Sequence, residues 1–366
     1  MRLRFVLAAL LLALGLSSGA SATLLFAGGE KADFICPIGS SCDISTSSGN
    51  FRAAWARGAV IEWAGYAVVD PPANRFATAP FASSVLWTHG QYCNVYNAGC
   101  DGNGSSADLQ MLRLMDSNGN AALMVRGTGT AGGVKISSRA ANGTMSDLVT
   151  CPSAFGTKLT QLDLYVNYSS TGEVALYNNS VKVCDFSGDV TNGDGATALT
   201  SVEFSSASLA ENGAWSEIIV ATTDTRAMAR FSANTVADGN TVGFSGTNIC
   251  SSIWNAFDPS DSQYAYSGAP NVLHECTINS AIPPGSYSVL GLVMTARALV
   301  GATGPQHFAF ATRVGGADYF SPDFAPLNSF SSLGNYIQAV NPATNAPWSV
   351  SDFQATGFNV GEKTKP

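Results

Sequence analysis

The chain has 366 residues, of which 46% are hydrophobic and only 12% are charged, and its formal net charge is −8. Its 18 lysines and arginines form no cluster, so a nucleic-acid partner is not expected, because phosphate binding depends on grouped cations. The most apolar segment after the N-terminus, Val289–Val300, is short and contains Arg297, so no membrane span is expected either.

The first 22 residues have the layout of a secretory signal peptide. Arg2 and Arg4 provide the positive start, Phe5–Leu16 is an unbroken apolar run, and Ala20-Ser21-Ala22 supplies the small residues of a cleavage site. We expect residues 1–22 to be removed and the protein to be secreted, either extracellular or periplasmic. A buried N-terminal helix is the alternative interpretation of the same run.

The 344 residues that follow are more than one hydrophobic core usually supports, so two domains are expected. The strand pattern of the sequence changes around Ala221–Arg230. We therefore place a first β domain at residues 23–222 and a smaller β-rich domain at residues 223–366.

Several elements can be predicted in the first half. Leu24–Gly29 suits an opening strand and Arg52–Arg57 a second one. Leu109–Arg126 predicts a hairpin, because two apolar runs flank the strong turn signal Asn118-Gly119. Gly127–Gly132 matches the phosphate-binding pattern GxGxxG, but a strand-like segment follows it instead of a helix, so a hairpin turn is expected.

The clearest strand pattern lies in Leu159–Val220. Every second residue of its first run is apolar, as in a strand with one face on a core: Leu162, Leu164, Val166 and Tyr168. Glycines and asparagines separate the later runs, as turns require. We predict an antiparallel meander.

The second half is less clearly patterned. Its best strands are Tyr287–Ala298 and Gln306–Val314, with Gly301–Pro305 as the turn between them. The last residues, Glu362–Pro366, are expected to be frayed.

Eight cysteines in an exported chain favour disulfides over metal binding or catalysis. About 105 pairings are possible, and we take as a hypothesis that sequence neighbours pair. The expected bridges are Cys36–Cys42, Cys93–Cys100, Cys151–Cys184 and Cys250–Cys276. No CxxC motif occurs, which disfavours a structural zinc site.

Three loops alternate oxygen-bearing side chains as calcium loops do: Asp101–Ser105, Asp116–Asn120 and Asp189–Gly195. The first two lack the glycine and glutamate of a calcium loop, and Val190 replaces a ligand in the third. We expect ordinary Asx turns and no cofactor. A calcium site assembled from separate loops stays open.

No catalytic motif stands out. The three histidines, His89, His274 and His307, do not occur in HExxH, and no GxSxG occurs. Glu203 and Glu217 are a conceivable carboxylate pair for glycoside hydrolysis, but glutamates at strand edges are usually solvated. We therefore expect a protein that is not an enzyme.

Aromatic residues in loops are the remaining candidates for a binding site. The candidate ligand-binding residues are Trp87, Tyr92, Trp254, Asp258, Tyr264 and Tyr266. Exposed rings stack on sugars, and a carboxylate orients the hydroxyl groups. The alternative is that these rings fill the ends of a sandwich, since large aromatics are more often core than site.

The segment LDLYVNYSSTGEVALYNNSVKVCDFSG resembles the strand sequences of concanavalin A-like, laminin-G-type jelly rolls. This resemblance implies two stacked antiparallel sheets. LLFAGGE, LWTHGQ, PGSYSVLGLVMTARALVGATGPQHFAFATRVGGADYFSP and the segment NPATNAPWSVSDFQATGFNVG are similar to bacteriophage virion and tail-associated structural proteins, although the signal peptide and cysteines depart from them. That similarity implies a structural, non-catalytic role.

Together these observations predict an all-β protein, a concanavalin A-like jelly-roll sandwich followed by a smaller β domain. The expected function is that of a secreted surface or structural protein that contacts other proteins or itself. A lectin-like glycan-binding protein is the alternative, and a polysaccharide hydrolase the third reading.

Overall fold

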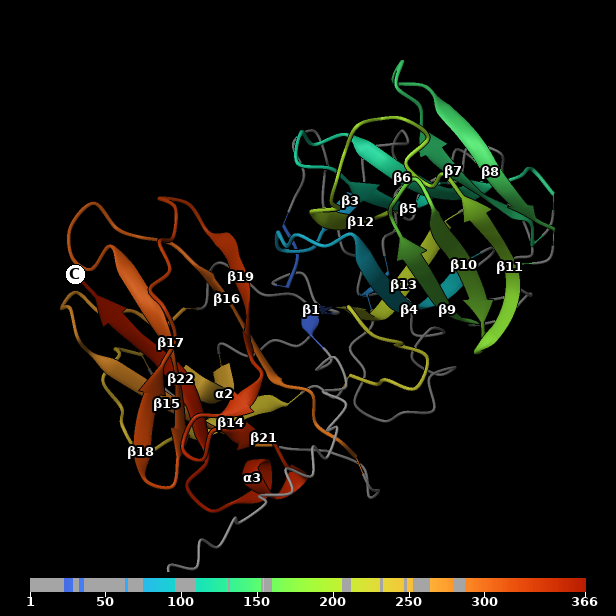
Figure 1. The fold of residues 1–366 in the computed structure, drawn as a ribbon. Coiled ribbons are helices and arrows are strands. Elements are labelled where there is room, and N and C mark those ends of the chain that lie inside the picture. The colour runs from blue at the N-terminus through green and yellow to red at the C-terminus, as the bar shows by residue number, and fades with distance from the viewer. Residues whose placement is uncertain are drawn as a thin grey trace, which may run out of the picture.

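The computed structural model describes residues 23–28, 33–35, 63–64, 75–95, 110–130, 132–152, 154, 160–205, 212–230, 233–246, 249–252, 264–279 and 287–366. Within these ranges the regular structure is almost entirely β-strand, and the two helices are short (Figure 1). Neither described helix has the length and apolarity needed to cross a bilayer. The all-β prediction is confirmed.

The first thirteen strands build a two-layer antiparallel sandwich. One layer has the order β1-β13-β4-β9-β10-β11, with β2 paired to β13, and the other has the order β3-β12-β5-β6-β7-β8. The first layer contains β1 (Leu24–Gly28), β2 (Trp63–Ala64), β4 (Val85–Val95), β9 (Thr160–Asn167), β10 (Gly172–Asn178), β11 (Val181–Gly188) and β13 (Asn212–Ala221). The second contains β3 (Arg75–Ala77), β5 (Gln110–Met115), β6 (Ala121–Gly127), β7 (Val134–Arg139), β8 (Met145–Cys151) and β12 (Ser201–Ser205). This is the predicted jelly-roll sandwich.

The core lies between the two layers. The predicted inward residues of β9 are all buried, from Leu162 at 3% exposure to Val166 at 0%. They join one cluster with apolar side chains of the opposite layer, such as Leu114 and Ile136. The predicted disulfide Cys151–Cys184 is confirmed, and it links edge strand β8 of one layer to edge strand β11 of the other.

The meander prediction is right for β9, β10 and β11, which pair in sequence order. It is wrong for the rest of the segment. Strand β12 lies in the opposite layer, and β13 returns to the first layer between β1 and β4. Alternation identifies the buried face of a strand but carries no information about which sheet the strand joins.

The two predicted hairpin turns are confirmed. Strands β5 and β6 pair antiparallel, and Asp116 Oδ1 accepts hydrogen bonds from the backbone N–H groups of Asn118 and Asn120, each at 2.8 Å. The GxGxxG segment joins β6 to β7, where Gly127 pairs with Val134. Asp189 also forms an Asx turn, accepting from the N–H groups of Thr191 and Asn192.

The later strands form separate sheets. A five-stranded sheet has the order β14-β15-β22-β17-β18, and two-stranded ribbons are formed by β16 with β19 and by β20 with β21. The strands are β14 (Asn234–Asp238), β15 (Leu273–Asn279), β16 (Leu292–Ala298), β17 (His307–Val314), β18 (Ala317–Phe320), β19 (Ser331–Gln338), β20 (Val340–Asn341), β21 (Ala346–Pro347) and β22 (Asn359–Lys365). The helices are α2 (Ile249–Ser252) and α3 (Val350–Gln354). The division into two domains at residue 222 stays a prediction.

Two predictions for this half are wrong. The C-terminal residues are not frayed, because Glu362–Lys365 belong to β22, which pairs with β15 on one side and β17 on the other. The expected hairpin around Gly301–Pro305 does not form either, since β16 pairs with β19 and β17 with β22 and β18. The polar sequence of β22 resembles a tail because its stabilisation comes from backbone bonding to distant strands.

Candidate ligand-binding site

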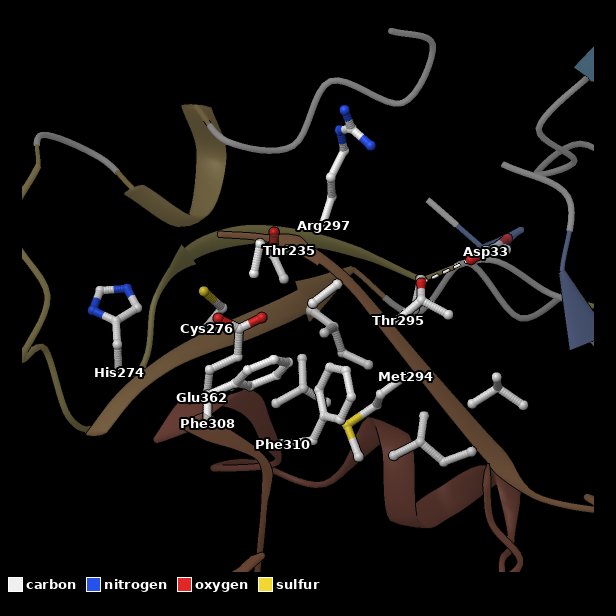
Figure 2. A pocket seen from close by; sticks show the side chains of 18 of the residues that line it. Asp33, Thr235, His274, Cys276, Met294, Thr295, Arg297, Phe308, Phe310 and Glu362 are labelled. Carbon is white, nitrogen blue, oxygen red and sulfur yellow. Dashed lines mark hydrogen bonds between the residues drawn. The ribbon is translucent and has the colours of Figure 1, made fainter. Parts of the chain in front are cut away.

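One face of the five-stranded sheet is covered at both sides but open in the middle. On the β14–β15 side it is covered by α2, which the confirmed disulfide Cys250–Cys276 ties to β15. On the β17 side, the β16–β19 ribbon packs Met294 and Ala296 against Phe308 and Phe310. Between these two covers lies a cavity of about 1290 Å³ (Figure 2).

The floor of the cavity is β22, which contributes Val360, Glu362 and Thr364 to its lining. In the sheet register, Glu362 stands between His274 of β15 and Phe310 of β17. Directly opposite residues on neighbouring strands share one face, so these three side chains form a row. Figure 2 shows the Glu362 carboxyl group rising from the sheet into the cavity, with His274 on one side and the phenylalanine rings on the other.

Close approach of β22 to β15 fixes this row. A Cβ atom on Gly361 would lie 2.1 Å from the carbonyl oxygen of His274, far inside van der Waals contact. Only glycine fits at this position, next to the residue that supplies the carboxyl group.

Glu362 has an altered acidity. Glu362 lines the cavity, and desolvation by burial raises the pKa of its carboxyl group to about 7. No hydrogen bond or ion pair joins its carboxyl group to another residue of the described ranges. At neutral pH this carboxyl group is therefore close to half-ionised, and it is available to bind a molecule in the cavity.

His274 is held in its neutral form. Burial lowers the pKa of its imidazole, although Asp238 at 3.8 Å opposes this shift. The ring stacks on Phe244 with centroids 5.4 Å apart, and its Nδ1 accepts a hydrogen bond from the Phe244 N–H at 3.4 Å. His274 therefore adds no positive charge beside Glu362 at neutral pH.

A metal-like cluster borders the same region. Ligand atoms of Cys250, His274 and Cys276 lie within 4.8 Å of one another. The two sulfurs are bonded to each other, however, and metals bind the thiolate form of cysteine. In this disulfide form the cluster offers a metal only the imidazole of His274.

Two of the predicted ligand-binding residues lie at the cavity. Tyr264 and Tyr266 line it, and they are 56% and 58% exposed. The Tyr264 ring lies 6.3 Å from that of Tyr266 and 5.8 Å from that of Phe330, which also lines the cavity. Trp254 and Asp258 lie outside the described residues.

The first sandwich contributes a further wall, through Leu24, Ala27 and Asp33. The Asp33 carboxylate accepts a hydrogen bond from Thr295 Oγ1 at 2.7 Å (Figure 2). It also pairs with Arg230 at 3.3 Å. Unlike Glu362, this second carboxylate of the cavity wall is therefore already satisfied.

Trp87 and Tyr92, two more of the predicted ligand-binding residues, lie on opposite faces of β4. Trp87 faces outward from β4, and its ring lies 5.0 Å from that of Tyr165 and 5.4 Å from that of Tyr177. Tyr92 is 1% exposed and packs against Trp215 in the core, so its predicted ligand role is wrong. The two residues are five apart on one strand, and an odd separation places side chains on opposite faces.

The conceivable catalytic pair does not assemble either. Glu203 is on β12 and Glu217 on β13, in different layers of the sandwich. Both are buried rather than solvated: Glu203 pairs with Arg75 and Arg113, and Glu217 accepts a hydrogen bond from the Arg230 N–H at 3.1 Å. The expectation of solvated glutamates was wrong because charged partners and backbone donors satisfy them inside.

Some predictions lie outside the residues whose side chains or backbone the structure describes. These are the Cys36–Cys42 and Cys93–Cys100 pairings, the signal peptide and the expected strand at Arg52–Arg57. The Asp101–Ser105 loop also lies outside them.

No family model and no curated protein sequence matches the chain. Among solved structures it is similar to an endo-β-1,4-glucuronan lyase from Trichoderma reesei, at 11% identity over 55% of this chain and 96% of that one, with a TM-score of 0.32. It is also similar to a galectin from Caenorhabditis elegans, at 13% identity over 43% of this chain and 95% of that one, with a TM-score of 0.27. A pentraxin from Limulus polyphemus is 11% identical over 45% of this chain and 76% of that one, with a TM-score of 0.30. With such low scores, these likenesses carry no functional argument.

Proposed function

We propose that this chain is a non-enzymatic, secreted binding protein whose cavity above Glu362 receives an apolar molecule. The observation that carries this proposal is the combination in one cavity of apolar and aromatic walls with the carboxyl group of Glu362, which has no partner among the residues that the structure describes. Ligand sites are typically concave and mostly apolar, with few polar groups that fix the ligand's orientation.

The size of the cavity supports a ligand larger than a single ring. Its volume of about 1290 Å³ exceeds the range of roughly 300–1,000 Å³ that drug-sized ligands usually occupy. A lipid-like chain or a fused-ring molecule would fill it better than a monosaccharide. Burying such a ligand gains roughly 25 cal/mol for each Å² of apolar surface removed from water.

The arrangement of carboxyl groups supports binding rather than hydrolysis. Hydrolysis of glycosides needs two carboxyl groups across the scissile bond. Among the described residues that line the cavity, the acidic ones are Glu362 and Asp33, and Asp33 is bound to Thr295 and Arg230. The two disulfides agree with an extracellular or periplasmic location.

A fluorescence titration with the uncharged probe N-phenyl-1-naphthylamine tests this function. Ala298 lines the cavity, and a tryptophan there would occupy part of its volume. Ala317 is exposed on β18 and does not line the cavity, so Ala317→Trp is the matched control. We expect saturable binding to the wild type and to Ala317→Trp and at least about tenfold weaker binding to Ala298→Trp. Equal binding to all three proteins, or none, would refute the proposal.

Glycan binding is the second candidate, and the ring row of Trp87, Tyr165 and Tyr177 favours it. Such rows stack on sugar faces. The Arg226 guanidinium lies 4.5 Å from the Tyr177 ring centroid and is bound to Asp224, so a sugar would have to displace it. A glycan array tests this candidate, with loss of binding expected in Trp87→Ala if it is correct and a blank array if it is not.

The sequence also predicts that the protein contacts other proteins or a second copy of itself. This prediction follows from the resemblance to virion proteins. Light scattering over a wide concentration range tests it. A mass that rises with concentration would support assembly, and a constant monomer mass would contradict self-association.

A further inference from the structure

We propose that the molecule held in this cavity carries a positively charged amine, and that Glu362 binds the amine as a carboxylate. This inference rests on the proposed function, because it names the chemical class of the ligand for the same cavity. It follows from the charges and rings that surround Glu362.

The basic side chains that line the cavity interact with groups other than Glu362. Arg230 pairs with Asp33, and the His307 ring nitrogen lies 2.7 Å from the carbonyl oxygen of Pro366. Arg297 also has an interaction of its own. Among the described lining residues, Glu362 is thus the charge-bearing group whose counter-ion a ligand can supply.

The surroundings of Glu362 suit an ammonium better than a hydroxyl group. Phe310 is its direct neighbour in the sheet, and Phe308 lies on the same face of β17. The faces of aromatic rings attract cations, and this attraction grows as water is removed. A carboxylate beside aromatic rings therefore recognises a protonated amine by two additive interactions, whereas an alcohol uses only a hydrogen bond.

Binding should be linked to pH through the same carboxyl group. Below a pKa of about 7, Glu362 is protonated, and an ammonium must displace that proton before it can pair. The other titratable groups at the cavity are His274 from β15, His307 from β17, Arg297 from β16, Tyr264, Tyr266, Tyr287, Asp33 and Arg230. With the pKa of His274 lowered, its ring stays neutral from neutral pH upward.

The test is a displacement of N-phenyl-1-naphthylamine by octylamine and by octanol, which share one apolar chain. At pH 8 we expect octylamine to bind at least about tenfold more tightly than octanol to the wild type. In Glu362→Gln the ratio should fall to about one. Asp323→Asn removes the same charge from an exposed residue that pairs with Lys365, and it should keep the wild-type ratio.

The wild type alone provides a second measurement if Glu362→Gln does not fold. Its affinity for octylamine should drop by up to about tenfold per pH unit below 7, while its affinity for octanol stays constant. Equal affinities for both compounds at pH 8 would overturn the inference but leave the proposed function standing. Failure of the neutral probe itself to bind would overturn both.

Discussion

Asn335 on β19 hydrogen-bonds to both backbone groups of Ala27 on β1, although 308 residues separate them. Its side-chain oxygen accepts from the Ala27 N–H at 3.1 Å, and its amide nitrogen donates to the Ala27 carbonyl at 2.7 Å. Among the described strands, β1 pairs with β13 alone and so lies at an edge of its layer. One amide side chain therefore takes the place of a neighbouring strand and joins the sandwich to the wall of the cavity.

Asn335→Ala should weaken this junction. Both backbone groups of Ala27 would lose their partners in a partly buried setting, which costs about 1–3 kcal/mol for each buried group left unpaired. We expect a lower urea midpoint and faster hydrogen exchange at the Ala27 amide. Asn118→Ala, in the exposed β5–β6 turn, is the control and should leave hydrogen exchange at the Ala27 amide unchanged. Unchanged exchange at Ala27 in Asn335→Ala would contradict this role.

Arg139→Met should be strongly destabilising. Its guanidinium pairs with Asp116 and reaches Asp194 at 3.5 Å, and both carboxylates are fully buried. Removing the cation leaves two buried negative charges, so a loss of about 3–5 kcal/mol in the free energy of unfolding is expected. Lys182→Met breaks an exposed pair with Asp185 and should leave the free energy of unfolding close to the wild-type value, because water screens exposed ion pairs. Urea denaturation measures the free energy of unfolding of both variants. Similar losses would disprove the claim that Arg139 stabilises the fold by neutralising buried carboxylates.

The double substitution Cys151→Ala and Cys184→Ala should destabilise the sandwich. The bridge spans 33 residues of sequence and links edge strands of the two layers. Loss of a bridge over such a loop removes about 4 kcal/mol through the greater freedom of the unfolded chain. A thermal melt of the double variant should show a markedly lower midpoint than the wild type. Chemical reduction of the wild-type disulfides should also lower the midpoint. An unaltered midpoint would mean that the layers hold together without this link.

The stability of the protein should depend on the ionisation of Glu362. Burial raises the pKa of this group from 4.5 to about 7, so the folded state binds its proton more tightly than the unfolded state. Its contribution is therefore complete below pH 4.5 and is lost as the pH rises to 7, by up to about 3 kcal/mol.

Glu362→Gln cannot ionise and should not show that loss. The difference in unfolding free energy between this variant and the wild type should therefore shift in the variant's favour between pH 5 and pH 8. Urea denaturation at the two pH values measures it. A difference that does not change with pH would show that the carboxyl group is freely solvated.

The sandwich was largely predictable because short sequence segments encode its buried strand faces and its turns. Alternation in Leu162–Tyr168 identifies the buried face of β9, and Asn118-Gly119 identifies a turn, without any knowledge of the partner strands. The same parity rule, applied to Trp87 and Tyr92, would have separated them. The prediction that both are ligand-binding loop residues overlooked that they lie on one strand.

The cavity was not predictable in this way. Glu362 lies in a polar segment that resembles a solvated tail, and its environment depends on His274 and Phe310 from strands distant in sequence. Tyr264 and Tyr266 were found because aromatic clustering is visible in the sequence. The carboxyl group that gives the site its chemistry had no such signal, apart from its regular spacing with Val360 and Thr364.

The most direct measurement is a crystal structure of the protein with an iodinated apolar amine, located by the anomalous scattering of iodine. We predict one iodine site between β22 and the β16–β19 ribbon, with the amine nitrogen within hydrogen-bonding distance of the Glu362 carboxylate. Iodine found only at the Trp87 ring row or on the outer surface, with the cavity holding nothing but water, would contradict the account.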